Sequence, residues 1–135
     1  MDLKKLMFEE EILPPEGEYE AIILEACFRN YNSGNEGIGV TLMIRNDIEQ
    51  ECQDMELTDQ LVKTKAAIYK FRMIRNAIPK VIEHPWENLQ ELAKLIVAQP
   101  VRIYVKHRED VYGQTVASIS SYKKGEPFEL DEEYK

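Results

Sequence analysis

The spacing of hydrophobic positions changes twice along the chain, from a period of two residues to a period near four and back again. Residues 17–28 are rich in apolar and β-compatible side chains, and residues 38–45 alternate between two faces, as half-buried strands do. A third strand is expected within residues 51–62. The segment 30–37, dense in Asn, Ser and Gly, is expected to form a loop between the first two strands.

The middle of the chain follows a helical pattern. Its first apolar stripe has spacings of four, three and four residues, which place its members on one helical face: Ala67, Phe71, Ile74 and Ile78. Pro79 ends this predicted helix. A second helix is expected to begin near Pro85 and to end at Pro100. Its apolar stripe consists of Leu89, Leu92, Ala93 and Ile96.

The last part of the chain returns to a period of two. Residues 101–108 alternate, residues 109–113 contain hairpin-forming residues, and residues 114–122 form a last strand. Three strands, a helical insertion and two strands follow the order of the OB-fold, a five-stranded Greek-key barrel. We therefore predict a mainly β protein, a five-stranded OB-like barrel with helices between strands 3 and 4. A small α+β sheet with helices on one face is the rival fold.

A chain of 135 residues fits one domain. We expect this domain to span residues 1–124, with residues 1–14 as an N-terminal arm or short helix. Residues 125–135 are expected to form an acidic flexible tail. The start of the chain lacks the apolar core of a signal peptide, and no apolar run approaches the roughly 20 residues of a membrane span. We therefore expect a cytosolic protein whose cysteines, Cys27 and Cys52, are buried free thiols.

The net charge of −8 argues against a polyanionic ligand until its distribution is considered. Residues 1–60 carry 4 basic and 15 acidic side chains, whereas residues 61–124 carry 12 basic and 5 acidic ones. Residues 125–135 carry 1 basic and 5 acidic side chains. Because binding depends on the local field, a basic middle between acidic flanks is compatible with a nucleic-acid site. The same distribution is also compatible with an ordinary solvated surface.

The chain lacks the usual signatures of an enzyme. It has neither a phosphate-binding Gly-rich loop nor a dinucleotide-binding turn. His84 and His107, the two histidines, lie on different predicted elements, and neither cysteine has a partner at catalytic or metal-binding spacing. We therefore expect no catalytic residues, no metal and no cofactor.

Basic and aromatic side chains alternate on one predicted strand face. A sequence-tolerant single-strand binder needs cations that follow the phosphates and rings on which bases stack. One strand face offers both, at a same-face spacing of roughly 7 Å: Arg102, Tyr104, Lys106 and Arg108. The alternative interpretation is an outer face covered by long solubilising side chains, and the pattern leaves both open.

Further candidate contacts lie where OB-folds bind oligonucleotides, on strands 2–3 and on the loops joining strands 1–2 and 4–5. In the predicted fold these loops are residues 29–37 and 108–113. We expect Arg45 on the outer face of the second strand and two lysines just after the third. The full set of these additional candidates is Arg29, Tyr31, Arg45, Lys63, Lys65 and Tyr112.

Four segments occur in the order seen in a known family: residues 15–20, 44–47, 101–106 and 121–123. The chain resembles a family of small phage and prophage proteins of formerly unknown function, regarded as single-stranded-DNA-binding proteins of recombination or replication modules. The resemblance spans roughly residues 14–124. It implies an OB-like fold and a DNA-linked role in the cytoplasm of a bacterial host, and it carries no catalytic residues. Gln99 stands where the resemblance predicts glycine, which argues against a tight turn before the following strand.

The acidic C-terminal segment is similar in kind to the tails by which bacterial single-strand-binding proteins recruit partner enzymes. Its candidate partner-binding residues are Phe128, Asp131, Glu132 and Glu133. The segment ends in Tyr-Lys instead of the acidic-Pro-Phe ending of those proteins. An ordinary frayed terminus is the alternative.

Our first hypothesis is therefore sequence-tolerant single-stranded-DNA binding in phage replication or recombination. It includes a phage recombinase or helicase as a partner of the tail, excludes a membrane, and leaves homo-oligomerisation open. The alternative is a non-catalytic protein-interaction module that binds a host or phage protein, which the overall acidity favours. An unrecognised hydrolase is a distant third.

Overall fold

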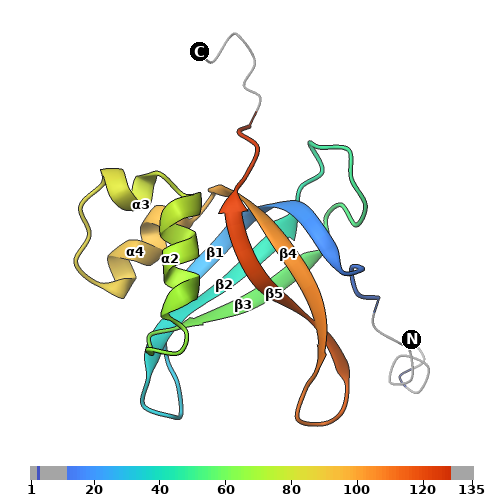
Figure 1. Cartoon of the computed structure of the whole chain (residues 1–135), viewed down its shortest axis with the longest axis horizontal. Coiled ribbons are helices and arrows are strands. Elements are labelled where there is room, and N and C mark those ends of the chain that lie inside the picture. Colours follow the sequence, from blue (N-terminus) through green and yellow to red (C-terminus); the bar gives the residue numbers. More distant parts are fainter. Residues whose placement is uncertain (1–2, 4–11, 129–135) are drawn as a thin grey trace.

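The computed structural model describes Leu3 and residues 12–128, in which five antiparallel strands form one sheet beside three helices (Figure 1). The strands are β1 (Gly17–Asn30), β2 (Glu36–Ile44), β3 (Glu56–Val62), β4 (Pro100–Glu109) and β5 (Thr115–Lys124). The helices are α2 (Ile68–Ala77), α3 (Lys80–Glu83) and α4 (Leu89–Ile96). The mainly β class and the position of the helices between the third and fourth strands are thereby confirmed.

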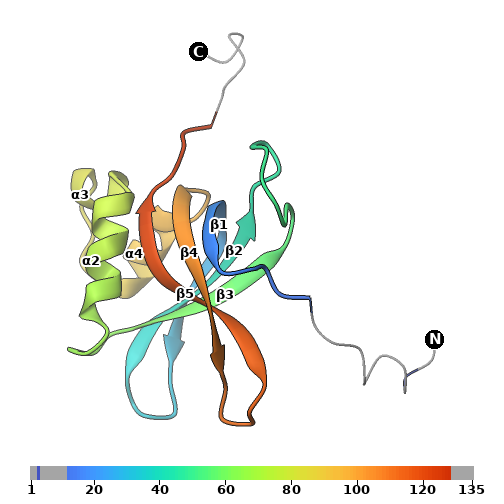
Figure 2. The same ribbon diagram turned by 45° about the vertical axis from the view of Figure 1, so that its right-hand side comes forward.

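The long first strand organises the sheet. The strand order is β3-β2-β1-β4-β5, with residues 21–30 of β1 pairing with β2 and residues 17–22 pairing with β4. A register shift between Ile23 and Glu25 interrupts the ladder, and such a bulge bends a strand and increases its twist. The two edge strands, β3 and β5, approach each other as the sheet curves (Figure 2).

The predicted barrel is not closed. Within the part of the chain that the structure describes, the sheet ends at β3 on one side and β5 on the other. Side chains bridge these edges: Asp59 on β3 accepts hydrogen bonds from Tyr122 on β5 and from Lys70 on α2. The open edge is therefore lined with polar groups where a closed barrel would have a backbone ladder.

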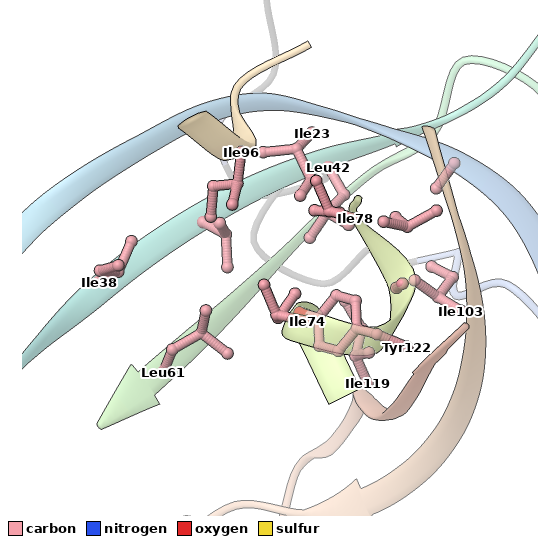
Figure 3. Close-up of a cluster of buried hydrophobic side chains, with 14 of the residues drawn as sticks. Ile23, Ile38, Leu42, Leu61, Ile74, Ile78, Ile96, Ile103, Ile119 and Tyr122 are labelled. Atoms are coloured by element: carbon pink, nitrogen blue, oxygen red, sulfur yellow. The ribbon is translucent and has the colours of Figure 1, made fainter. Parts of the chain in front are cut away.

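The core lies between the curved sheet and the helices (Figure 3). Alternate residues of all five strands point into it, together with one face each of α2 and α4. Its labelled members are at most 2% exposed: Ile23, Ile38, Leu42, Leu61, Ile74, Ile78, Ile96, Ile103, Ile119 and Tyr122. The apolar stripes predicted for the helices agree with this packing, because Ile74, Leu92 and Ile96 are buried.

Several boundaries differ from the sequence prediction. The strand β1 continues to Asn30, so that Arg29 lies on a strand and not in a loop. The turn that follows is closed by the Tyr31 amide, which donates to the Asn35 carbonyl. The short helix α3 was not predicted. Helix α4 begins after Asn88, whose side chain accepts from the Glu91 amide at 2.9 Å, as an N-cap does.

A tight turn connects α4 to β4 even though glycine is missing from it. Ala98 adopts φ 66°, a left-handed conformation that costs an L-residue roughly 1–2 kcal/mol. Its amide donates to the Ile23 carbonyl at 2.7 Å, and the Ile23 amide donates to the Gln99 carbonyl at 3.1 Å. These bonds to β1 hold the turn, and the expectation drawn from Gln99 was therefore wrong.

Both cysteines are free thiols, but the expectation that both are buried was wrong. Cys27 is exposed on the outer face of β1, where its strand partner is Gly39. Cys52 is half-buried in the loop between β2 and β3. Among the described residues, no helix has the length and apolar character needed to cross a membrane.

Candidate nucleic-acid interface

A groove of about 540 Å³ lies between the two edge strands. We call it the edge groove. Its walls come from β3, from β5 and its preceding hairpin, and from the first half of α2. Its polar lining residues include Asp59, Gln60, Lys70, Arg108, Asp110 and Ser118. The groove exists because the sheet does not close at this position.

The two carboxylates in the edge groove already have partners. Asp59 is held by the Lys70 ammonium at 2.8 and 3.0 Å and by the Tyr122 hydroxyl at 2.7 Å. Asp110 accepts from the backbone amides of Tyr112 and Gln114 at 2.9 and 3.0 Å, which closes the β4–β5 turn. Burial, followed by the charge of Asp59, raises the pKa of Tyr122 well above its usual value. The hydroxyl therefore remains a donor throughout the neutral range.

A second feature, which we call the Tyr31 platform, lies on the outer face of β1, β2 and β3 and consists of Arg29, Tyr31 and Gln60. The Tyr31 hydroxyl donates to Gln60 Oε1 at 2.6 Å. Gln60 also lines the edge groove, so the platform and the groove share this residue. Burial raises the pKa of the Tyr31 hydroxyl, although the nearby Arg29 charge opposes this.

Two glycines on β2 make room for the platform. A Cβ atom at Gly37 would lie 2.9 Å from Tyr31 Cε2 and would also clash with the Leu61 carbonyl. A Cβ atom at Gly39 would lie 3.0 Å from Arg29 Nε. The ring and the guanidinium group therefore lie directly over bare backbone, at a close approach that larger residues would prevent.

A basic hollow of about 600 Å³ adjoins the end of β3 and the start of α2. It is lined by Lys63, Thr64, Lys65, Ile68 and Arg72. The three cations are exposed. Both lysines were predicted contacts, whereas the arginine that α2 adds to them was not predicted.

The β1–β2 and β4–β5 hairpins project from the same end of the sheet (Figures 1 and 2). The tip of the β4–β5 hairpin carries Val111 and Tyr112, which are 92% and 87% exposed. An aromatic ring so exposed contributes little to packing. It is available for contact beside the edge groove, whose wall includes the neighbouring Arg108 and Asp110.

The predicted basic row on β4 is divided into two parts. Arg102 Nε lies 2.7 Å from Glu20 Oε1, and Arg102 Nη2 lies 3.4 Å from Glu126 Oε1. Tyr104 is half-buried opposite Glu18 of β1. Lys106 and Arg108 are exposed, and only Arg108 of the row lines the edge groove. The row therefore does not form one basic surface.

The prediction that Arg45 lies on the outer face of the second strand was wrong. Arg45 lies just after β2, and its side chain is buried, with only 2% exposed. Its guanidinium makes a bidentate ion pair with Asp47 at 2.8 and 2.6 Å and a hydrogen bond to the Glu126 carbonyl. The guanidinium carbon also lies 4.4 Å from the centroid of the Phe128 ring. Arg45 therefore anchors the C-terminal segment and is not available to a nucleic acid.

The described part of the C-terminal segment is bound to the sheet. In addition to the contacts with Arg45, the Glu126 amide donates to Glu20 Oε2 at 3.1 Å. Glu126 and Phe128 therefore contact the sheet and its loops, and the flexibility expected for residues 125–135 stays a prediction. The other predicted partner-binding residues, Asp131, Glu132 and Glu133, lie outside the described residues.

Two residues that hold other side chains of the site in place were not predicted: Gln60, which binds Tyr31, and Lys70, which binds Asp59. Gln60 and Lys70 were not selected, because neither stands out in its own segment. Gln60 could have been found from the alternation of β3, which directs it to the outer face. Lys70 could have been found from its spacing on the helix α2, because it lies four residues before the buried Ile74 and so shares its face.

Comparison with known protein families shows a match over almost the whole chain. Residues 3–133 match the family model described as "Protein of unknown function (DUF669)". A search of curated proteins finds no match to the chain. The family match covers all the elements described above.

Proposed function

The chain belongs to the DUF669 family of proteins of unknown function, and for this member we propose sequence-tolerant binding of single-stranded DNA. The observation that carries the proposal is that Gln60 both binds the Tyr31 hydroxyl and lines the edge groove. Proteins that bind single strands without sequence preference combine a cationic groove with aromatic faces on which bases stack. The combined surface offers Tyr31 and Tyr112 as rings and Arg29 and Arg108 as cations.

The strand order supports an OB-like fold for this protein. An OB-fold is a partly open five-stranded Greek-key barrel that binds oligonucleotides on one strand face and between two loops. The order β3-β2-β1-β4-β5, with helices between β3 and β4, agrees with that arrangement. In this interpretation the opening between β3 and β5 is the partly open seam, and the two projecting hairpins are the binding loops.

The local charge around the groove favours a polyanion despite the net charge of −8. The carboxylates of Asp59 and Asp110 are satisfied within the protein. Four exposed cations remain along the groove and the basic hollow beside it: Lys63, Lys65, Arg72 and Arg108. If each contacts one phosphate, the logarithm of the binding constant should fall with the logarithm of salt concentration with a slope of about −3.

We place this activity in phage replication or recombination, in the cytoplasm of a bacterial host. This part of the proposal depends on the resemblance carried by residues 15–20, 44–47, 101–106 and 121–123. The protein would coat and protect single strands while other proteins act on them. Phage recombinases and helicases are the classes of partner that such a role requires.

A matched pair of variants at Tyr31 tests the proposal. Tyr31→Leu removes the aromatic face, and the loss of one stacked base, worth about 1–3 kcal/mol, should weaken binding to labelled oligo-dT about 5- to 150-fold. Tyr31→Phe keeps the ring and loses only the hydrogen bond to Gln60, and should bind nearly as well as the natural chain. Fluorescence anisotropy measures both. Equal affinity of Tyr31→Leu and the natural chain would refute stacking on this platform.

The alternative function is a protein-interaction module. An apolar groove among the three helices, lined in part by the exposed Ile82 and by Trp86, favours it, as does the acidity of the chain. Failure to bind oligo-dT at low salt, combined with retained folding, would make this alternative the better account.

A further inference from the structure

The three helices enclose an apolar groove of about 440 Å³, which shares Ile68 and Arg72 with the basic hollow but not with the edge groove. We call it the helical groove. Its apolar lining is contributed by all three helices and by the segment before α4: Ile68, Phe71, Val81, Ile82, Trp86 and Leu92. Ile82 is 68% exposed and Trp86 is 37% exposed. Apolar side chains of this size, exposed together around a groove, mark a site that another segment covers.

The rim of the helical groove is basic. Arg72 and Arg75 both line it from α2. Neither forms an ion pair with a carboxylate among the residues that the structure describes. An apolar floor beside two cations of this kind suits a segment that interleaves apolar and acidic residues.

The chain itself contains such a segment. Residues 129–135 read Glu-Leu-Asp-Glu-Glu-Tyr-Lys, with four acidic side chains around Leu130 and Tyr134. The residues just before this segment lie close to the helices, because Gly125 and Pro127 line a cavity of about 310 Å³ together with Ala77 and Pro79 at the junction of α2 and α3. Seven extended residues reach about 23 Å, whereas the ten residues of α2 rise only about 15 Å.

We propose that residues 129–135 occupy the helical groove of their own chain. Leu130 and Tyr134 would cover the apolar floor beside Trp86, and the acidic residues would face Arg72 and Arg75. The contacts of Arg45 with Phe128 and with the Glu126 carbonyl fix the base of the segment. A short tether of this kind gives a tail an effective concentration in the millimolar range, so that a weak contact is sufficient to fill the groove.

Trp86 provides the signal for a test, because it is the only tryptophan of the chain and lines the helical groove. The full-length double variant Leu130→Ser/Tyr134→Ser keeps the charge of the tail and removes its apolar contacts. We expect its Trp86 emission to shift to longer wavelength and its acrylamide quenching to rise at least twofold, with unchanged circular dichroism.

Charge reversal on the rim gives an independent test. Arg72→Glu/Arg75→Glu should reproduce the change in Trp86 emission, whereas the matched control Lys94→Glu, on the exposed side of α4, should not. A synthetic peptide of residues 126–135 should bind the Leu130→Ser/Tyr134→Ser variant and compete poorly for the natural chain, whose groove is occupied.

Three results would overturn the proposal. The first is identical Trp86 emission and quenching in the natural chain and the Leu130→Ser/Tyr134→Ser variant. The second is equal peptide binding by both proteins. The third is a dimer in sedimentation that the variant abolishes, because the tail would then belong to a second copy. No DNA is present in these measurements, so their outcome is independent of the proposed function.

Discussion

The hydroxyl of Tyr122 on β5 donates a 2.7 Å hydrogen bond to Oδ2 of Asp59 on β3, and it joins the two edges of the sheet. Tyr122 is 2% exposed, and the Asp59 side chain is 11% exposed. Lys70 binds the same carboxylate from α2. The separation of the edges, and with it the edge groove, is therefore set by three side chains where a closed barrel would have a backbone ladder.

This bond predicts how stability depends on alkaline pH. Burial raises the pKa of Tyr122 well above its usual value and that of Tyr19 to about 12. Between about pH 10 and the pKa values of the folded state, the unfolded chain binds fewer protons than the folded chain. The stabilisation contributed by these two protonated hydroxyls should therefore be complete below about pH 10. The free energy of unfolding should fall as the pH rises further. Urea unfolding at several pH values from about 8 to 11 measures this slope.

Tyr122→Phe should lower the free energy of unfolding by about 1–2 kcal/mol at pH 8, because Asp59 loses a buried partner. It should also flatten the alkaline slope. The control Tyr112→Phe changes an 87% exposed side chain and should alter neither quantity. If Tyr122→Phe left the alkaline slope unchanged, the loss of stability at high pH would come from the titration of another group.

Arg45 is predicted to contribute to stability and not to DNA binding. Arg45→Ala removes a bidentate ion pair and the anchor of the C-terminal segment, which should cost about 2–3 kcal/mol. Asp47 is 44% exposed and can be hydrated, which keeps the cost below that of a stranded buried charge. Urea unfolding measures the loss, and affinity for oligo-dT should stay within about twofold under conditions where the variant is folded.

Ala98→Gly should stabilise the protein. Glycine adopts φ 66° without the steric cost that alanine carries, although it adds entropy to the unfolded chain. The net gain should be about 0.5–1 kcal/mol. Thermal unfolding measures it, and Ala93→Gly within α4 should change stability in the opposite direction, by about 1 kcal/mol. A loss of stability in Ala98→Gly would contradict the strained turn.

Two arginines on β4 provide a matched test of the proposed interface. Arg108→Ala removes a cation that lines the edge groove and should reduce the salt slope of oligo-dT binding by about 0.7. Arg102→Ala removes a cation already paired with Glu20 and Glu126 and should leave the slope unchanged. If Arg102→Ala reduced the salt slope and Arg108→Ala did not, the interface would lie at the other end of β4.

The secondary structure could be predicted because it depends on local periodicity. Val101, Ile103 and Val105 are all buried and alternate with more exposed residues, and Leu92 and Ile96 share the buried face of α4. The failure at Arg45 has a local cause as well. The strand β2 ends at Ile44. Side chains alternate between the two faces only within a strand, so the pattern does not predict the direction of the next residue, Arg45.

The ion pair of Arg102 with Glu20 was not predicted, and the reason is long-range. Glu20 is 82 residues away from Arg102 in the chain, and only the pairing of β1 with β4 brings the two together. The Tyr31–Gln60 bond likewise joins residues 29 positions apart. Contacts of this kind follow from the register of the paired strands. The hydrophobic pattern predicts which face of a strand is buried, but not which residue of the neighbouring strand lies opposite.

Titration of labelled oligo-dT with the full chain at increasing salt measures single-strand binding by this protein most directly. We predict binding at about 50 mM salt, preference over duplex DNA of the same length, and a slope of about −3 in log binding constant against log salt. No binding at about 50 mM salt by a folded chain would show that the four exposed cations and the aromatic platform do not form a site for a polyanion.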